Sequence, residues 1–321
     1  MSRKPAIGVM YRREQDPANL TQAARRAEEL GYDQFWIVED CFYLGGISQT
    51  AIALAATETI KVGIGINPGV AHNAAILAME YSTLERAFPG RLIGGIGHGV
   101  DIWMKQIGEA VASPLTAIEE TTVAMKRLLN GERITVDGRY VKLTDVVLDP
   151  PPASAPPILL GVRAEKSMRL AGKVADGALL AESSGADYIR WSRNLLDESR
   201  DQPGTIGVYA HTWIDDADPA AARKVMREVV AGAVGNEIAV NTAHLGYVDE
   251  LKKLIDAGGP PSLLASMPEE WVSDLGISGS VADGQASIDA YAAAGADYVI
   301  LTPMPEWDWM QWLEDSAVLL G

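Results

Sequence analysis

The sequence predicts a (β/α)8 barrel. Eight apolar runs are suited to strands, with helical patterns between them, near residues 5–10, 33–39, 60–66, 91–97, 157–161, 177–181, 205–213 and 298–302. The runs at 60–66 and 91–97 lack the polar alternation of a half-solvated strand, which favours a parallel sheet covered by helices. Eight strands, each followed by a helix or a long connection, indicate a barrel.

A repeated joint between helix and strand supports this prediction. An alanine-rich helix, a glycine, an aspartate two residues later and an apolar strand follow one another in RRAEELGYDQFWIV (25–38) and YAAAGADYVILT (291–302). RLAGKVADGALLA (169–181) is a compressed version. We expect the glycine to end the helix in a left-handed conformation and the aspartate to turn the chain into the next strand.

The main alternative fold is a doubly wound open sheet, which would carry a phosphate-binding glycine motif after the first strand. IGVMYRREQDPANL contains none. We therefore expect one barrel domain over residues 1–321, with two insertions. Segment 132–149 reads as a hairpin that turns at Asp137-Gly138, and segment 218–276 reads as a helical excursion before the last strand.

Composition excludes several classes of function. A formal charge of -16 over 321 residues argues against nucleic-acid and anionic-membrane partners, because either would need a basic face. The single cysteine, Cys41, excludes an internal disulfide framework and a cysteine-rich metal site. With no signal peptide and no long apolar run in the sequence, we expect a cytoplasmic protein.

Segment 60–99 is the most glycine-rich part of the predicted sheet. Its two strands carry six glycines, which suggest that a flat ligand or another backbone comes close: Gly63, Gly65, Gly94, Gly95, Gly97 and Gly99. The helical pattern between the strands places Ile76, Met79, Leu84 and Ala87 on one side.

The carboxyl ends of barrel strands hold the candidate catalytic groups. Glu39 and Asp40 follow the second strand and are candidates for general acid-base chemistry, since apolar neighbours and a second negative charge would raise one pKa. His98 lies between two glycines after the fourth strand. His72 and His98 lack zinc-ligand spacing, so we expect no metal. Trp36 reads as a core residue.

An anion site is expected later in the chain. In PILLGVRAEKSMRLAG (157–172) a strand ends at Gly161 and a helix starts near Ala164, where backbone N–H groups can hold an anion, with Arg163 or Lys166 adding charge. Ser183 and Ser184 follow the sixth strand and would lie beside this turn.

These blocks together resemble the luciferase-like flavin and deazaflavin oxidoreductases. The carriers are ELGYDQFWIVED, KVGIGINPGVAHNAAILAMEYSTLERAFPGRLIGGIGHG, SPLTAIEETTVAMKRLLNGERITVDGRYVKL and PPILLGVRAEKSMRLAGKVADGALL. Within that family the chain is most similar to the coenzyme F420-dependent branch, which includes methylenetetrahydromethanopterin reductase and F420-dependent glucose-6-phosphate dehydrogenase.

The resemblance implies a cis peptide bond at Gly65-Ile66, in a bulge against the central ring of the cofactor. It implies proton handling near Glu39 and Asp40, with Asp40 where relatives carry a histidine, or Cys41 after a one-residue shift. The cofactor-binding residues that it implies are Gly65, Ile66, Asn67, Gly97, His98, Gly99, Gly161, Val162, Ala164, Glu165, Ser183 and Ser184.

The expected function is hydride transfer between C5 of F420 and a small organic substrate. Because Ala164 stands where relatives commonly have glycine, FMN remains the alternative cofactor, with an FMN-dependent monooxygenase as the alternative function. A non-catalytic flavin-binding or structural relative is the third reading. The expected partners are a small-molecule substrate and further copies of the chain, in a homodimer or higher homo-oligomer.

Overall fold

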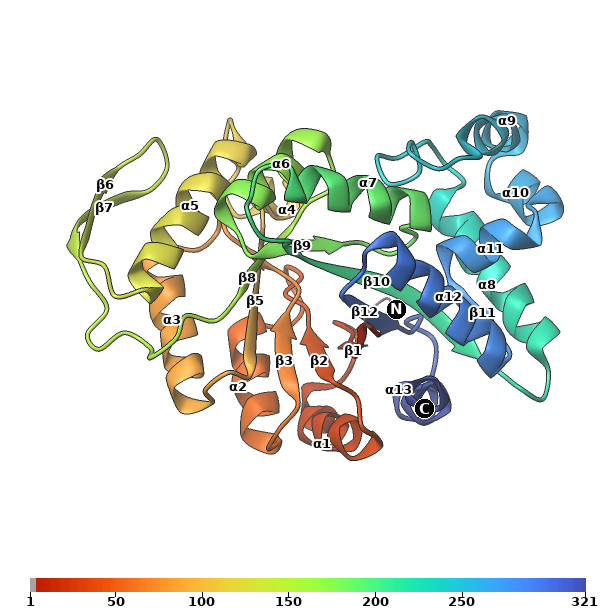
Figure 1. Ribbon diagram of the computed structural model, residues 1–321, viewed down its shortest axis with the longest axis horizontal. Helices are drawn as coiled ribbons and strands as arrows, with labels where there is room; N and C mark the ends of the chain where they lie inside the picture. Colours follow the sequence, from red (N-terminus) through yellow and green to blue (C-terminus); the bar gives the residue numbers. More distant parts are fainter. Residues whose placement is uncertain (1–3) are drawn as a thin grey trace.

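In the computed structural model, which describes residues 4–321, a parallel sheet closes into an eight-stranded barrel (Figure 1). Each strand pairs with the next in parallel, and the last pairs with the first. The strands are β1 (Ala6–Tyr11), β2 (Gln34–Ile37), β3 (Lys61–Ile64), β5 (Leu92–Gly97), β8 (Ile158–Gly161), β9 (Gly177–Leu180), β10 (Thr205–Ile214) and β12 (Tyr298–Thr302). The predicted barrel and its eight strands are confirmed.

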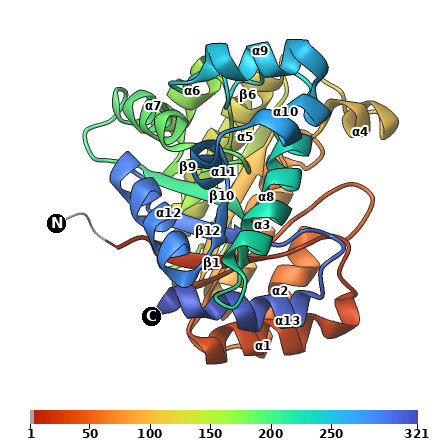
Figure 2. The ribbon, with the colours of Figure 1, turned by 90° about the vertical axis from the view of Figure 1, so that its right-hand side faces the viewer.

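Helices surround this barrel, as Figures 1 and 2 show. They are α1 (Leu20–Leu30), α2 (Gly46–Ala56), α3 (Ala74–Ala87), α4 (Asp101–Gln106), α5 (Pro114–Leu129), α6 (Glu165–Val174), α7 (Ala186–Asp197), α12 (Val281–Ala294) and α13 (Trp309–Ser316). Two short strands extend the sheet: β4 (Asn67–Pro68) on β5 and β11 (Ile277–Gly279) on β10. Within residues 4–321, no helix combines the length and apolarity that a membrane crossing requires.

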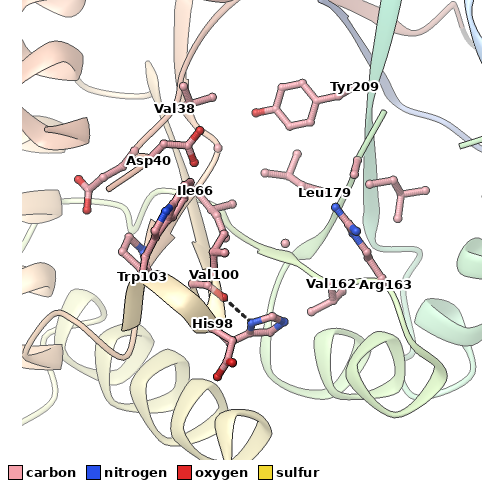
Figure 3. A pocket seen from close by; sticks show the side chains of 18 of the residues that line it. Val38, Asp40, Ile66, His98, Val100, Trp103, Val162, Arg163, Leu179 and Tyr209 are labelled. Atoms are coloured by element: carbon pink, nitrogen blue, oxygen red, sulfur yellow. Dashed lines mark hydrogen bonds between the residues drawn. The ribbon is translucent and has the colours of Figure 1, made fainter. Parts of the chain in front are cut away.

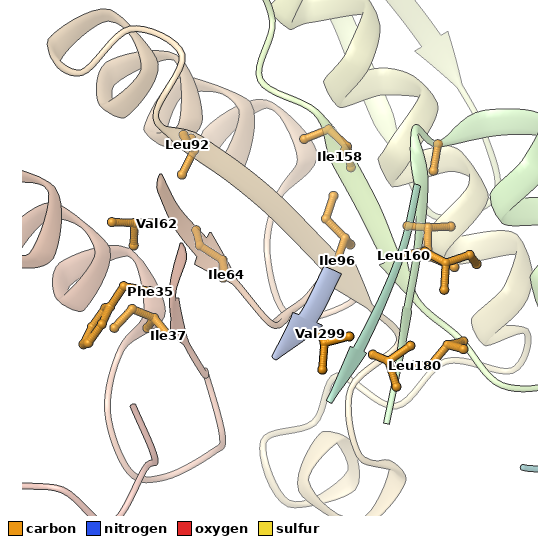
Figure 4. Packing of buried hydrophobic residues seen from close by; sticks show 14 of the residues in the cluster. Phe35, Ile37, Val62, Ile64, Leu92, Ile96, Ile158, Leu160, Leu180 and Val299 are labelled. Carbon is orange, nitrogen blue, oxygen red and sulfur yellow. The ribbon is translucent and has the colours of Figure 1, made fainter. Parts of the chain in front are cut away.

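Both faces of the strands are buried, which explains their continuous apolar sequences. In β2, Phe35 and Ile37 face outward into the layer between sheet and helices, where they pack with residues such as Val62 and Ile64 (Figure 4). Trp36, between them, points into the barrel instead. The period-2 alternation therefore separates two apolar environments rather than core from solvent.

Glycines make room for large side chains inside the barrel. A Cβ on Gly63 would lie 2.4 Å from the Trp36 ring, and one on Gly8 would lie 2.8 Å from it. Trp36 is fully buried, as expected, and its indole N–H donates to Gln34 Oε1 at 2.8 Å. Protein side chains, rather than a ligand, therefore account for these two glycines.

The helix–glycine–aspartate joints hold neighbouring strands at the amino-terminal end of the barrel. Gly31 and Gly295 end α1 and α12 with φ of 92° and 114°, as predicted. Asp33 accepts the Ile7 N–H of β1 at 2.7 Å. Asp297 accepts the Ile206 N–H of β10 at 2.9 Å. Each aspartate thus fixes the start of the strand beside its own.

The third joint keeps the aspartate but not the glycine cap. Asp176 accepts the Ile158 N–H at 2.8 Å. Gly172, however, lies inside α6, which ends at Val174 with an extended Ala175 after it. A Cβ on Gly172 would lie 2.3 Å from the Leu196 carbonyl oxygen of α7. The prediction of a left-handed cap was wrong here, because this glycine serves close packing between two helices.

The predicted face of α3 was also wrong in part. Ile76 and Met79 are 54% and 45% exposed, whereas Leu77 and Tyr81 are buried. Tyr81 packs where Gly94 has no side chain: a Cβ there would lie 2.3 Å from the ring. The orientation of α3 is therefore set by the side chains that fit against β5.

The predicted hairpin is present as β6 (Ile134–Asp137) and β7 (Lys142–Val146), and it extends outward beyond α5 (Figure 1). Its turn is longer than predicted, because Asp137 pairs with Lys142 and four residues lie between them. Glu120 of α5 accepts the backbone N–H groups of 139–141 at 2.8–2.9 Å. The turn wraps around this carboxylate, and a two-residue turn could not.

The predicted helical insertion is confirmed between β10 and β12. It consists of α8 (Pro219–Val234), α9 (Val248–Gly258), α10 (Pro260–Ser266) and α11 (Glu269–Leu275), around an apolar cluster of its own. Figure 1 shows α9 and α10 at the opposite end of the molecule from the hairpin.

Replacing Asp33 by alanine is expected to destabilise the fold, because it leaves the Ile7 N–H without its acceptor. The cost of a lost acceptor for a part-buried donor is about 1–3 kcal/mol of unfolding free energy. Urea unfolding of Asp33→Ala and of Asp289→Ala, an exposed aspartate on α12, measures it. Equal stabilities of the two variants would contradict this function for Asp33.

Candidate functional site

A cavity of about 540 Å³ opens at the carboxyl ends of the barrel strands (Figure 3). Seven of the residues predicted to bind the cofactor line it: Gly65, Ile66, His98, Gly99, Gly161, Val162 and Ala164. Glu39 and Asp40 line it as well. Neither the hairpin nor helices α8–α11 contribute to the lining. The insertions therefore lie outside this site.

Glu39 is held by three donors at the end of β2. Its Oε2 accepts the Gly46 N–H at the start of α2 at 2.7 Å and the Asn67 side-chain amide at 2.9 Å. Its Oε1 lies 2.7 Å from His72 Nε2. The Asn67 oxygen in turn accepts the Tyr81 hydroxyl at 2.7 Å. This network connects the loops after β2 and β3, and it occupies both carboxylate oxygens.

Asp40, the next residue, has a different environment. Its Oδ2 accepts Arg13 Nη1 at 2.8 Å, and its carboxyl group lines the cavity. Burial raises the pKa of Asp40 above the ordinary value, the nearby Arg13 opposes that rise, and the charges of Glu14 and Glu182 add to it. Asp40 is therefore the cavity carboxyl whose pKa is shifted toward that of a proton donor.

Burial raises the pKa of one carboxyl group of the pair, as predicted, but the expected contributions of the apolar neighbours Phe42 and Tyr43 and of the Glu39 charge were wrong. Phe42 and Tyr43 are 64% and 54% exposed, so they do not bury the carboxyl group. The charges that raise the pKa belong to Glu14 and Glu182 rather than to Glu39.

Arg13 connects the loops after β1 and β2 with helix α4 at the mouth of the cavity. Its guanidinium pairs with Asp40 and with Glu14 at 2.8 and 2.9 Å. The same group lies 4.6 Å from the centre of the Tyr43 ring and 5.9 Å from that of Trp103. Trp103 of α4 also lines the cavity. These contacts fix Arg13 while it modulates the charge of Asp40.

The part of the cavity wall that follows β3 contains the predicted cis peptide bond. The Gly65-Ile66 bond is cis, as the resemblance implied, and a second non-prolyl cis bond lies at Cys41-Phe42. The Ile66 side chain turns toward β5 and β8: a Cβ on Gly97 would lie 1.7 Å from Ile66 Cδ1, and one on Gly161 would lie 3.0 Å away. Gly97 therefore makes room for Ile66, which itself forms the cavity wall.

His98 is exposed at the rim, and its Nδ1 lies 2.8 Å from the Gly99 carbonyl oxygen (Figure 3). The other histidine considered, His72, lies beside Glu39 rather than at a metal site. Among residues 4–321 no cluster of three or more histidine, cysteine or acidic residues could hold a metal ion.

The expected anion site lies at the turn between β8 and α6. Ala164, the residue that precedes α6, makes no side-chain hydrogen bond to the helix start, so the first N–H groups of α6 lack a side-chain cap. Ser167 and the exposed Arg163 both line the cavity here. Glu165 points away from the lining and pairs with Arg169 at 3.1 Å. The geometry suits a phosphate group.

Ser183 and Ser184 are buried beside this turn but do not line the cavity. Ser184 Oγ donates to the Ala181 carbonyl at 2.7 Å, whereas Ser183, with φ of 57°, has a buried Oγ without a partner. Asn241, from the insertion, donates to the Ser183 carbonyl at 2.9 Å. Their predicted binding of the cofactor stays a prediction.

Sequence reasoning missed several polar groups of the lining, among them Tyr209 and Glu182. Tyr209 lies within the apolar run of β10, where nothing in the sequence separates an inward-facing phenol from core. Glu182 directly follows β9, and its place at a carboxyl strand end was the available signal.

Comparisons with known proteins agree with this geometry. The family model described as luciferase-like monooxygenase matches residues 3–298. The chain is 28% identical over 298 residues, 88% of each chain, to 5,10-methylenetetrahydromethanopterin reductase of Archaeoglobus fulgidus. It is 26% identical over 197 residues, 58% of each chain, to F420-dependent glucose-6-phosphate dehydrogenase of Nakamurella multipartita.

A solved structure shows the same fold in complex with FMN. The oxygenating constituent of 3,6-diketocamphane monooxygenase from the CAM plasmid of Pseudomonas putida, in complex with FMN, superposes with a TM-score of 0.73. It is 19% identical, and the match covers 99% of this chain and 97% of that one. With the family model matching most of the sequence, the barrel closed and the cavity at the carboxyl ends of its strands, this chain is an oxidoreductase that belongs to the luciferase-like monooxygenase family.

Proposed function

We propose that this protein transfers hydride between C5 of coenzyme F420 and a small organic substrate. The observation that carries the proposal is the cavity itself, which joins the Gly65-Ile66 wall to the start of α6 and contains one carboxyl group with a raised pKa. The F420-dependent relative supports the choice of cofactor.

The residues present fit such a cofactor. The uncapped start of α6 and the exposed Arg163 suit its phosphate, while Ile66 and Val162 offer apolar surface to a flat ring system. When bound, the deazaflavin would supply the hydride chemistry. The protein would supply orientation in the cavity and a proton at Asp40.

In this proposal Asp40 and Glu39 would have different roles. Asp40 would hold or release a proton at its cavity-facing carboxyl, with Arg13 adjusting its pKa. Glu39 would position the loops after β2 and β3 through Gly46, Asn67 and His72. His98 would be the next candidate for proton transfer, because its ring lies at the rim.

An FMN-dependent monooxygenase is the second candidate, since the family model is described as monooxygenase and the superposed camphor-plasmid enzyme holds FMN. The well-formed cavity with its lining of glycines and polar groups argues against a non-catalytic relative.

Titrating the purified protein with F420 and FMN in parallel tests the cofactor. We expect tighter binding of F420, measured by the change in cofactor fluorescence. Binding of FMN alone would favour the monooxygenase, and binding of neither would favour a non-catalytic relative.

Replacing Asp40 by asparagine is expected to lower turnover by roughly 10²–10⁴-fold, the usual loss when an acid-base group is removed. Cofactor affinity should change little, because the side chain keeps its size. Asp101→Asn is the matched control, since Asp101 also lines the cavity but is 76% exposed and pairs with Lys105. Wild-type turnover in Asp40→Asn would contradict this role for Asp40 and would make His98 the next candidate for proton transfer.

Replacing Arg13 by glutamine is expected to raise the pKa of Asp40 further, because the guanidinium favours the ionised carboxylate. The protonated form then persists to higher pH, so any rate that needs it declines at higher pH as well. Carbon NMR titration of labelled aspartate measures the pKa directly. Arg190→Gln, which breaks a surface pair with Asp187, should leave Asp40 unchanged. An unchanged Asp40 pKa in Arg13→Gln would show that the Arg13 charge does not affect the ionisation of Asp40.

A further inference from the structure

The hydroxyl group of Tyr209 is buried without a hydrogen-bond partner in the described chain. Tyr209 is 6% exposed. Five other tyrosines are as buried, and each hydroxyl donates to an oxygen at 2.7–2.9 Å: Tyr11, Tyr32, Tyr81, Tyr188 and Tyr291. A buried hydroxyl without a partner costs about 1–3 kcal/mol, so this exception calls for an explanation.

The unpaired hydroxyl faces the cavity. Tyr209 belongs to its lining, and in Figure 3 the ring extends from β10 with its oxygen directed toward the side where Val38 and Asp40 lie. A Cβ on Gly65 would lie 1.7 Å from this oxygen, so the hydroxyl lies against the Gly65-Ile66 wall. A ligand seated on that wall would meet the hydroxyl.

The phenol is fixed in this position. Its ring meets Trp36 edge to face, with centroids 5.9 Å apart and an interplanar angle of 79°. Ile300 and Leu179 from the neighbouring strands belong to the same buried cluster. A rigid ring cannot swing to another acceptor, so the missing partner has to come from the cavity.

The group is a neutral donor. Burial raises the pKa of Tyr209 far above its usual value, and the negative charges of Glu182 and Asp40 raise it further. At neutral pH the hydroxyl therefore keeps its proton and suits an uncharged acceptor such as a ring carbonyl oxygen.

We propose that Tyr209 donates a hydrogen bond to a ring carbonyl oxygen of the heterocyclic cofactor bound in this cavity. The proposal rests on the proposed function, because it takes the cavity to be the cofactor site. It adds a residue that would recognise the polar edge of the ring system, where Ile66 and Val162 would contact only its apolar face.

Tyr209→Phe tests this, because phenylalanine keeps the ring and removes the hydroxyl. In the cofactor-free protein the thermal midpoint should stay the same or rise, since an unpaired polar group is lost. The dissociation constant for the cofactor, measured without substrate, should rise about 5–10-fold, as for one lost hydrogen bond. The absorption maximum of the bound cofactor should shift.

Tyr291→Phe is the matched control. Tyr291 is equally buried, but its hydroxyl donates to the Asp274 carbonyl at 2.8 Å, away from the cavity. This variant should melt at a lower temperature than the wild type and bind the cofactor with wild-type affinity.

Two results would overturn the proposal while leaving the proposed function intact. One is wild-type cofactor affinity and an unshifted spectrum in Tyr209→Phe, which would leave substrate contact as the remaining use of the hydroxyl. The other is a clear fall in the thermal midpoint of Tyr209→Phe, which would show a structural partner within the chain. Failure of the wild-type protein to bind either F420 or FMN would overturn both.

Discussion

The interior of the barrel depends on Trp36. This side chain fills the space that Gly8 and Gly63 leave open on the strands to either side, and the Trp36–Gln34 hydrogen bond satisfies its indole N–H. The edge of Trp36 in turn supports the ring of Tyr209, whose hydroxyl lies against Gly65. The cavity wall is thus built on one buried aromatic residue. Interiors packed this closely transmit small changes in volume, so a side chain at Gly63 would disturb the site as well as the core.

Glu39 and Asp40 show how environment divides two adjacent carboxylates. Glu39 accepts hydrogen bonds from Gly46 and Asn67 and lies beside His72, so its charge is satisfied by the fold. Asp40 has Arg13 as its partner and otherwise faces the cavity and other negative groups. Both residues line the cavity, and their different hydrogen-bond partners, rather than their position in the chain, separate a carboxylate that holds two loops together from one that pairs only with Arg13.

Sequence patterns predicted the fold far better than the site, for a physical reason. Gly31 and Gly295 end their helices through contacts within a few residues, so these caps can be predicted locally. Gly172 packs against a carbonyl of another helix, and its prediction was wrong. The pairing of His72 with Glu39 and the unpaired hydroxyl of Tyr209 likewise depend on contacts between distant segments. Periodicity reports which residues are buried; it does not report which buried polar group lacks a partner.

Two parts of the cavity lining have hydrogen-bonding capacity that the described residues do not satisfy. A folded chain pairs almost all of its buried polar groups, so exceptions mark places where stability was given up or where a ligand completes the pairing. Around this cavity the start of α6 lacks a side-chain cap and Tyr209 lacks an acceptor among the described residues, while Glu39, which also lines the cavity, has both carboxylate oxygens paired. The unmet groups thus lie at two separate parts of the lining, an anion-binding turn and a neutral donor. A ligand that satisfies both must be elongated, with a negatively charged group at one end and an uncharged acceptor at the other.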